Sequence, residues 1–84
     1  MSRIRDEIDA TDTEIVAAVN RRLRLVTELW QLKRELHVDR LDPGREQTLR
    51  ARLAGENGGP LSEAGLERLV DELLALTKDE LGGT

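Results

Sequence analysis

The N-terminal part of the chain carries apolar side chains at the spacing of an amphipathic helix. No Gly or Pro interrupts it between Ser2 and Leu36, and Ser2 is of a residue type that caps helix N-termini. A period of 3.6 residues places one stripe along this segment: Ile4, Ile8, Thr11, Ile15, Ala18, Arg22, Val26, Leu29, Lys33 and Leu36. A second stripe lies beside the first: Asp12, Val16, Val19, Leu23 and Trp30. We therefore predict a single helix from Ser2 to about Leu36.

This helix is too long to be covered by the rest of one chain. At ~1.5 Å per residue it extends roughly 50 Å, whereas a compact chain of 84 residues has a radius of gyration near ~12 Å. The two stripes form a face too wide for one neighbouring helix, so we expect one stripe to pack within the subunit and the other against a second subunit. The expected fold is all-α, and its simplest assembly is a two-fold helical dimer.

A connection and a short helix are predicted next. The apolar period breaks at residues 37–41. We expect His37 to be a C-terminal residue of the first helix, where a positive charge interacts favourably with the helix dipole. Asp42 and Pro43 predict an N-cap and a first helical residue. An apolar edge then continues the second helix to about Ala54.

A loop and a third helix complete the chain. Residues 55–60, Gly-Glu-Asn-Gly-Gly-Pro, predict a turn, and Ser62 can cap the helix that follows. The stripe of this helix consists of Leu66, Leu69, Val70, Leu73, Leu76 and Thr77, with Leu81 one turn beyond. Gly82 begins a tail that terminates the helix. We therefore expect one domain over residues 1–84, built from a long, a short and a medium helix.

Composition excludes several classes of function. The chain has no Cys, hence no disulfide and no thiolate ligand, and a single His rarely makes a metal centre. A net charge of −4 and one aromatic residue, Trp30, disfavour nucleic-acid binding. No apolar run approaches twenty residues, and the start has no signal-peptide core. We expect a soluble, cytoplasmic protein.

Two cations interrupt the first stripe of the long helix. Arg22 and Lys33 are eleven residues apart, which corresponds to about 20° of rotation and roughly 16 Å along the helix axis. Unpaired cations on a buried face cost several kcal/mol unless an anion meets them. Each cation either reaches the surface or pairs with a Glu of another helix, or the two line a pocket for a doubly anionic ligand.

The familiar catalytic arrangements are absent from the sequence. There is no Cys nucleophile, no Ser–His–Asp set and no glycine-rich phosphate motif. Instead, polar groups stand on helix faces that should be apolar: Arg22 and Lys33, Glu46 at the start of the second helix, and Thr77 on the third. Arg5 is rotated about 100° from Arg22, towards the second stripe. Such a site would act by positioning and fixed charge, without covalent steps.

The spacing of these residues resembles that of the all-helical (AroQ class) chorismate mutases. The matching positions are Arg5, Arg22, Lys33, Asp42, Arg45 and Glu46. The opening residues 4–12, Ile-Arg-Asp-Glu-Ile-Asp-x-x-Asp, with the Arg21–Arg22 pair, resemble the first helix of that family. The resemblance covers essentially the whole chain and has no gap between Ile4 and Leu53.

The resemblance implies a fold and a reaction. Such proteins are intertwined dimers whose subunits have a long, a short and a third helix. They catalyse the Claisen rearrangement of chorismate to prephenate, a step towards phenylalanine and tyrosine, with no cofactor and no metal. The dianionic substrate is held in a chair-like conformation while the ether C–O bond breaks and a C–C bond forms.

The resemblance also implies residue roles. Arg22 would bind one substrate carboxylate beside Thr77, which stands where the family often has Ser. Arg5 of the partner subunit would bind the second carboxylate. Lys33 would contact a carboxylate and the ether oxygen, where negative charge grows in the transition state.

The second helix would contribute the remaining polar contacts. Glu46 would accept a hydrogen bond from the ring hydroxyl, helped by the backbone near Asp42. Arg45 would orient its neighbours, or it is a solvent-exposed helix residue. These roles, like the others, are implied by the family.

One position departs from the family pattern. Leu81 stands where a Gln or Glu usually hydrogen-bonds the ether oxygen, and the loss of one such donor corresponds to ~3 kcal/mol, or about 10²–10³ in rate. Three accounts are open. The enzyme is intrinsically weak, Glu80 reaches the site when the last turn unwinds, or a partner reshapes the C-terminus. Some similar short chorismate mutases are activated by the first enzyme of the shikimate pathway.

Two other functions stay open. A similar pocket can support an isochorismate pyruvate-lyase. A non-catalytic helical module that only dimerises or docks on a partner would instead pair Arg22 and Lys33 with Glu residues. A DNA-binding helix-turn-helix is a more distant alternative, because it would need a recognition helix rich in cations and amides.

Overall fold

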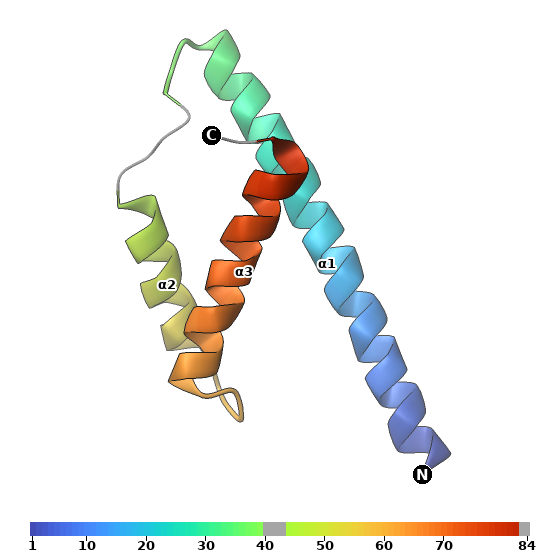
Figure 1. Cartoon of the computed structure of the whole chain (residues 1–84). Coiled ribbons are helices and arrows are strands. Elements are labelled where there is room, and N and C mark those ends of the chain that lie inside the picture. Colours follow the sequence, from blue (N-terminus) through green and yellow to red (C-terminus); the bar gives the residue numbers. More distant parts are fainter. Residues whose placement is uncertain (40–43, 83–84) are drawn as a thin grey trace.

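The computed structural model describes residues 1–39 and 44–82, and it is all-α. The chain forms a long helix α1 (Ser2–Glu35), a short helix α2 (Arg45–Glu56) and a medium helix α3 (Glu63–Leu81), as Figure 1 shows. The predicted fold class and the order of long, short and medium helices are confirmed.

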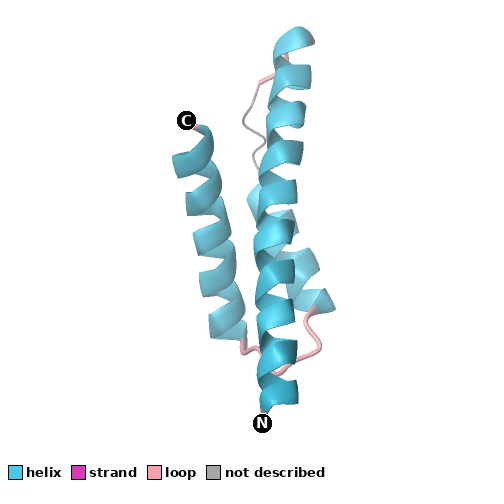
Figure 2. Cartoon of the chain, turned by 90° about the vertical axis from the view of Figure 1, so that its right-hand side faces the viewer, coloured by secondary structure: helices cyan, strands magenta, loops and turns pink. Residues whose placement is uncertain are grey.

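Helix α3 is the central element of the chain. It packs against α1 and against α2, whereas α1 and α2 make no direct backbone contact within the described residues. In Figure 1, α3 crosses the upper half of α1 and runs beside α2; Figure 2 shows the same arrangement from the side. Leu66 and Val70 of α3 form the buried apolar core. The position of α2 relative to α1 is therefore set through α3.

Only part of α1 is covered by the rest of the chain. Its half-buried residues are Val19, Arg22, Leu23, Val26, Trp30 and Lys33. Towards the N-terminus the apolar side chains are open to solvent, with Ile8 54% and Val16 61% exposed. The lower half of α1 accordingly stands apart from α2 and α3 in Figure 1.

The overall dimensions agree with this uneven cover. The chain measures 54 × 23 × 18 Å with a radius of gyration of 15.6 Å, against about 12 Å for a compact chain of this length. Its accessible surface is 7022 Å², whereas a compact monomer of this mass exposes about 5000 Å². A single subunit leaves far more surface open than a compact domain does.

The two ends of α1 differ in detail from the prediction. Met1 is the N-cap, and no side chain caps the helix, so the predicted Ser2 cap is wrong because Ser2 is already helical. The helix ends at Glu35, and His37 lies beyond it with φ 58°. The N–H groups of His37 and Val38 donate to the carbonyls of Arg34 and Lys33, which is a Schellman ending. His37 thus terminates α1 through its backbone and is not one of its helical residues.

Helix α2 begins and ends later than predicted. Its first residue is Arg45, and its N-cap is Gly44, whose φ of 93° is accessible to glycine without strain. No side chain caps this end, and the helix continues to Glu56. Asp42 and Pro43, the predicted N-cap and first helical residue, lie outside the described residues. The N-cap of the observed helix is Gly44.

The boundaries of α3 follow the prediction. The Ser62 hydroxyl accepts a hydrogen bond from the Gly65 N–H at 3.0 Å, so the predicted N-cap is confirmed. Glu63 lies in the first turn, where a negative charge is favourable. At the other end Gly82 adopts a left-handed conformation, and its N–H donates to the Lys78 carbonyl. The helix is therefore regular through Leu81.

Candidate functional site

Arg22 and Thr77 meet where α3 crosses α1. The Arg22 guanidinium donates from Nη1 to Thr77 Oγ1 at 2.6 Å, across a separation of 55 residues in the sequence. The Thr77 hydroxyl donates in turn to the Leu73 carbonyl at 2.8 Å. Thr77 is buried at 9% exposure. Its hydroxyl hydrogen is committed to the helix backbone, so its oxygen is available to accept from Arg22 and fix that side chain.

The electrostatic setting of Arg22 favours an incoming anion. Burial lowers the pKa of Arg22 from its ordinary value, and the nearby positive charge of Arg45 lowers it further. Arg22 makes no ion pair with a carboxylate of the described residues. The open alternative in which a Glu of another helix neutralises Arg22 is therefore not what this subunit forms. A half-buried cation with a second cation beside it is a site that an anion would stabilise.

Lys33 lies three turns further along the same stripe of α1. It is half-buried, and a hollow of about 200 Å³ beside it is lined by Trp30, Lys33, Arg34 and Val38. Arg34 is exposed, so of these two neighbouring cations Lys33 is the one turned towards the packed side of α1. Lys33 is therefore a second half-buried cation on this side of α1.

The start of α2 supplies a further cation and a carboxylate. Arg45 and Glu46 occupy the first turn of α2, and both are exposed. The positive charge of Arg45 is near enough to help lower the pKa of Arg22. Asp42, which the sequence analysis added to this group, lies outside the described residues.

Arg5 is not brought to these residues within one subunit. It is exposed in the bare half of α1, and Arg22 lies seventeen positions further on, which corresponds to about 25 Å of helix. A contribution of Arg5 from a partner subunit stays a prediction.

The end of α3 places Leu81 one turn beyond Thr77. Leu81 is half-buried, whereas Glu80 is exposed. The last turn is helical and closed by Gly82, so in this structure Glu80 is not turned to the side that Leu81 occupies. Leu81 presents an apolar surface at this corner of the site.

Arg50 is a residue that the sequence analysis missed. Its guanidinium pairs with Glu46 of its own helix at 2.9 Å and with two carboxylates of α3, Glu67 at 2.7 Å and Asp71 at 2.6 Å. These hydrogen bonds and charges raise the pKa of Arg50 above its ordinary value. The spacing gave a signal, since Glu46 and Arg50 stand four residues apart, as do Glu67 and Asp71.

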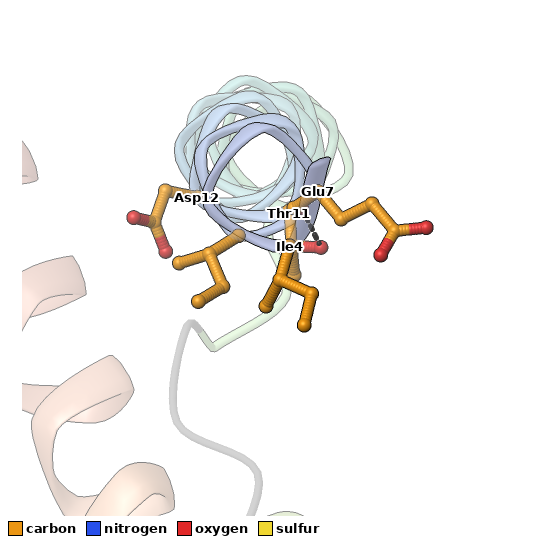
Figure 3. Close-up of a pocket in the computed structure, with 5 residues that line it drawn as sticks. Ile4, Glu7, Thr11 and Asp12 are labelled. Carbon is orange, nitrogen blue, oxygen red and sulfur yellow. Dashed lines mark hydrogen bonds between the residues drawn. The ribbon is translucent and has the colours of Figure 1, made fainter. Parts of the chain in front are cut away.

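The bare half of α1 carries a different surface. A hollow of about 240 Å³ lies against Ile4, Glu7, Ile8, Thr11 and Asp12. In Figure 3, Glu7 and Asp12 extend to opposite sides, with the apolar Ile4 between them. The Thr11 hydroxyl is bonded back to the Glu7 carbonyl at 2.8 Å. This surface is apolar in the middle and acidic at its edges, so it is unsuited to a small anion.

Two features of the described residues concern ligands and membranes. No three His, Cys, Asp or Glu side chains among them are grouped so as to hold a metal ion. No helix in the described part of the chain combines the length and the apolar character needed to span a membrane.

The arrangement of helices and polar residues can be compared with known proteins. Comparison with curated proteins and with solved structures gives no match. Comparison with protein families matches residues 4–80 to the family described as chorismate mutase type II. That range includes α2 and nearly all of α1 and α3, with Arg22, Lys33, Glu46 and Thr77 inside it. The chain therefore belongs to the chorismate mutase type II family.

Proposed function

We propose that this protein is a chorismate mutase, which converts chorismate to prephenate in the biosynthesis of phenylalanine and tyrosine. The observation that carries the proposal is the contact between the half-buried Arg22 and the buried Thr77 hydroxyl. It holds a cation that pairs with no carboxylate of the described residues, at the crossing of two helices in a chain of this family. A dianionic substrate would supply the missing negative charge.

The reaction is intramolecular, so the site has to fix one conformation and stabilise the charge that develops. Arg22, with its Nη1 held by Thr77, would bind one substrate carboxylate. Lys33 would contact a carboxylate and the ether oxygen, on which negative charge grows as the C–O bond breaks. Fixed cations aimed at that oxygen lower the barrier because they need no reorganisation during the reaction. Holding the two reacting carbons in a chair-like geometry adds the advantage of proximity.

The first turn of α2 would complete the subunit's own contribution. Glu46 would accept a hydrogen bond from the ring hydroxyl, near the backbone at Asp42. Arg45 would orient these groups and add to the positive field around Arg22. No covalent intermediate and no cofactor takes part in this mechanism.

A second subunit would supply the remaining carboxylate contact. Arg5 lies on the bare half of α1, about 25 Å of helix from Arg22, so it would reach the active site of a partner. The support is the excess of exposed surface, about 2000 Å² beyond that of a compact monomer, which is in the range that an obligate dimer buries. We therefore propose an intertwined homodimer in which each site combines both chains.

The function is tested by incubating the purified protein with chorismate and measuring prephenate. Lys33→Ala should lower kcat about 10²–10³-fold, the usual cost of removing one transition-state charge donor. The matched control is Arg34→Ala, which removes an exposed neighbouring cation and should keep the rate within twofold. A wild-type protein that leaves chorismate unchanged would refute the proposal.

The same samples separate the alternatives. Incubation with isochorismate that yields salicylate and pyruvate would assign the pyruvate-lyase reaction instead. A folded dimer that is inert towards both substrates would assign the non-catalytic docking module.

We also propose that the apolar Leu81 leaves this enzyme weak when alone and open to activation by a partner. Leu cannot donate to the ether oxygen, and a bound protein that rearranged the last turn of α3 could substitute another group. The first enzyme of the shikimate pathway is the proposed partner, as in similar short chorismate mutases. Adding it should raise kcat/KM, and an unchanged value would refute this activation.

A further inference from the structure

We propose that Arg50 is a positioning residue that places the Glu46 carboxylate by tying the first turns of α2 to α3. The proposal rests on the proposed chorismate mutase function and names a further residue on which that site depends. Arg50 itself would not touch the substrate.

The geometry is that of a three-armed clamp. Arg50 Nη2 donates to Glu46 Oε1 and to Asp71 Oδ1, while Nη1 donates to Glu67 Oε2. Glu67 and Asp71 lie on successive turns of one face of α3, so the guanidinium is held at two points of that helix. The donors of the planar guanidinium are fixed relative to one another. Its contacts with α3 therefore also fix the direction from which it binds the Glu46 carboxylate.

Helix α2 has few other features that would orient its first turn. It makes no backbone contact with α1 within the described residues, and no side chain caps its N-terminus. Leu49 and Leu53 are half-buried together with Arg50. Apolar contacts of this kind are non-directional, whereas the clamp specifies one rotation of α2 about its axis.

The clamp leaves Glu46 able to act. The pair with Arg50 engages Oε1, and Oε2 makes no hydrogen bond to any described residue. One carboxylate oxygen is thus anchored while the other can accept from a substrate hydroxyl. An exposed Glu side chain otherwise samples several rotamers, and restricting it before binding removes an entropic cost from the bound state.

The clamp should matter more for catalysis than for folding. Its carboxylates are exposed, and ion pairs between exposed groups contribute little to stability. The loss of Arg50 should therefore leave a folded protein whose site is misplaced.

The first test compares Arg50→Ala with Arg52→Ala. Arg52 is on the same helix and exposed, and among the described residues it pairs only with Glu56 of that helix, at 3.3 Å. We expect Arg50→Ala to lower kcat/KM for chorismate ten- to a hundredfold, because a small misplacement of a contacting group costs about that much. Arg52→Ala should stay within twofold. Circular dichroism should show both variants folded.

A double-mutant cycle separates positioning from a general structural role. In a Glu46→Ala background no carboxylate is left to place, so adding Arg50→Ala should change kcat/KM by less than about twofold. Glu67→Gln combined with Asp71→Asn removes both negative charges that hold Arg50 on α3, and it should lower kcat/KM severalfold when Glu46 is present.

The outcomes distinguish this inference from the proposed function. If the wild type forms prephenate and Arg50→Ala equals Arg52→Ala, the clamp is refuted while the function stands. An equal loss from Arg50→Ala with and without Glu46 also refutes it, because Arg50 would then act elsewhere. If the wild type forms no prephenate, the function fails and the clamp fails with it.

Discussion

The two halves of α1 share one apolar period but have different surroundings. From Val19 to Lys33 six side chains of the two stripes are half-buried against the rest of the chain, although Leu29 in the same range is 43% exposed. From Ile4 to Val16 the apolar positions of the same stripes are more than half exposed, between 54% and 61%. A periodic sequence therefore specifies which side of a helix avoids water, but it does not specify what covers that side.

The charges beside the two halves differ as well. The covered half has cations on the packed side, Arg22 and Lys33, whereas the bare half has Glu7 and Asp12 flanking its isoleucines. Half-buried cations suit a small anion, and an apolar strip with acidic edges suits another protein surface. The contrast fits the proposed ligand site at one end of the helix and the proposed subunit interface at the other.

The largest effect on activity is expected from removing Arg22 in the covered half of α1 or Arg5 in the bare half, because the proposed site uses both. Arg22→Ala and Arg5→Ala should each lower kcat/KM about 10²–10³-fold. Arg24→Ala is the control, since Arg24 is exposed on the opposite side of α1 from Arg22 and should have little effect.

Mixing the two inactive variants sharpens the same comparison. If each site takes Arg22 from one chain and Arg5 from the other, random exchange yields mixed dimers with one intact site and about a quarter of the wild-type activity. Activity would be measured after co-refolding the two proteins. No recovery would show that the two halves of α1 do not share a site across subunits.

A charge placed in the bare half should separate the subunits. Ile8→Glu would bury a carboxylate in the proposed interface, which costs several kcal/mol, so the mass from sedimentation should fall to one subunit and prephenate formation should fall more than tenfold. Ala10→Glu adds the same charge on the opposite side of the helix and should stay dimeric. A wild type already sedimenting as one subunit would contradict the interface.

A smaller effect, a gain in activity, is expected from a substitution at the end of α3. Leu81→Gln would place an amide donor one turn beyond Thr77 and should raise kcat/KM about tenfold or more, within the 10²–10³ that one donor supplies at most. Glu80→Gln, on the exposed side, is the control. If Leu81→Gln lowers the rate instead, the apolar contact at this corner matters more than a donor.

The smallest effect is expected at the helix caps. Ser62→Ala removes the hydrogen bond to the Gly65 N–H and should reduce the free energy of unfolding by about 1 kcal/mol. Ser2→Ala removes no capping bond and should change nothing. Urea unfolding followed by Trp30 fluorescence measures both, and an equal loss from the two variants would contradict the assignment of the caps.

Much of the fold could be predicted from residue patterns. The long uninterrupted period predicted α1 to within one residue of its observed end, and Ser62 predicted the start of α3. The errors lie at ends where backbone conformation decides. His37 adopts a positive φ usually left to Gly or Asn, and Gly44 begins α2. Residue type alone ranks the candidates for a cap without showing which one reaches an unpaired N–H.

Only part of the candidate site could be predicted from residue patterns. Arg22 and Lys33 were conspicuous because they stand on an apolar stripe, and Thr77 because it stands on another. Local periodicity did not show that Arg22 and Thr77 contact each other, and the sequence analysis assigned no role to Arg50. A side chain's role depends on which distant residue packs against it, and local periodicity carries no such information.

The sequence by itself determined three helices, their lengths and the apolar side of each, because these depend on interactions within a few residues. Only the tertiary structure decided that Arg22 donates a hydrogen bond to Thr77, that Arg50 links α2 to α3, and which half of α1 is left uncovered. Those outcomes depend on how α3 crosses α1 and lies along α2, which is set by the packing of side chains far apart in the chain.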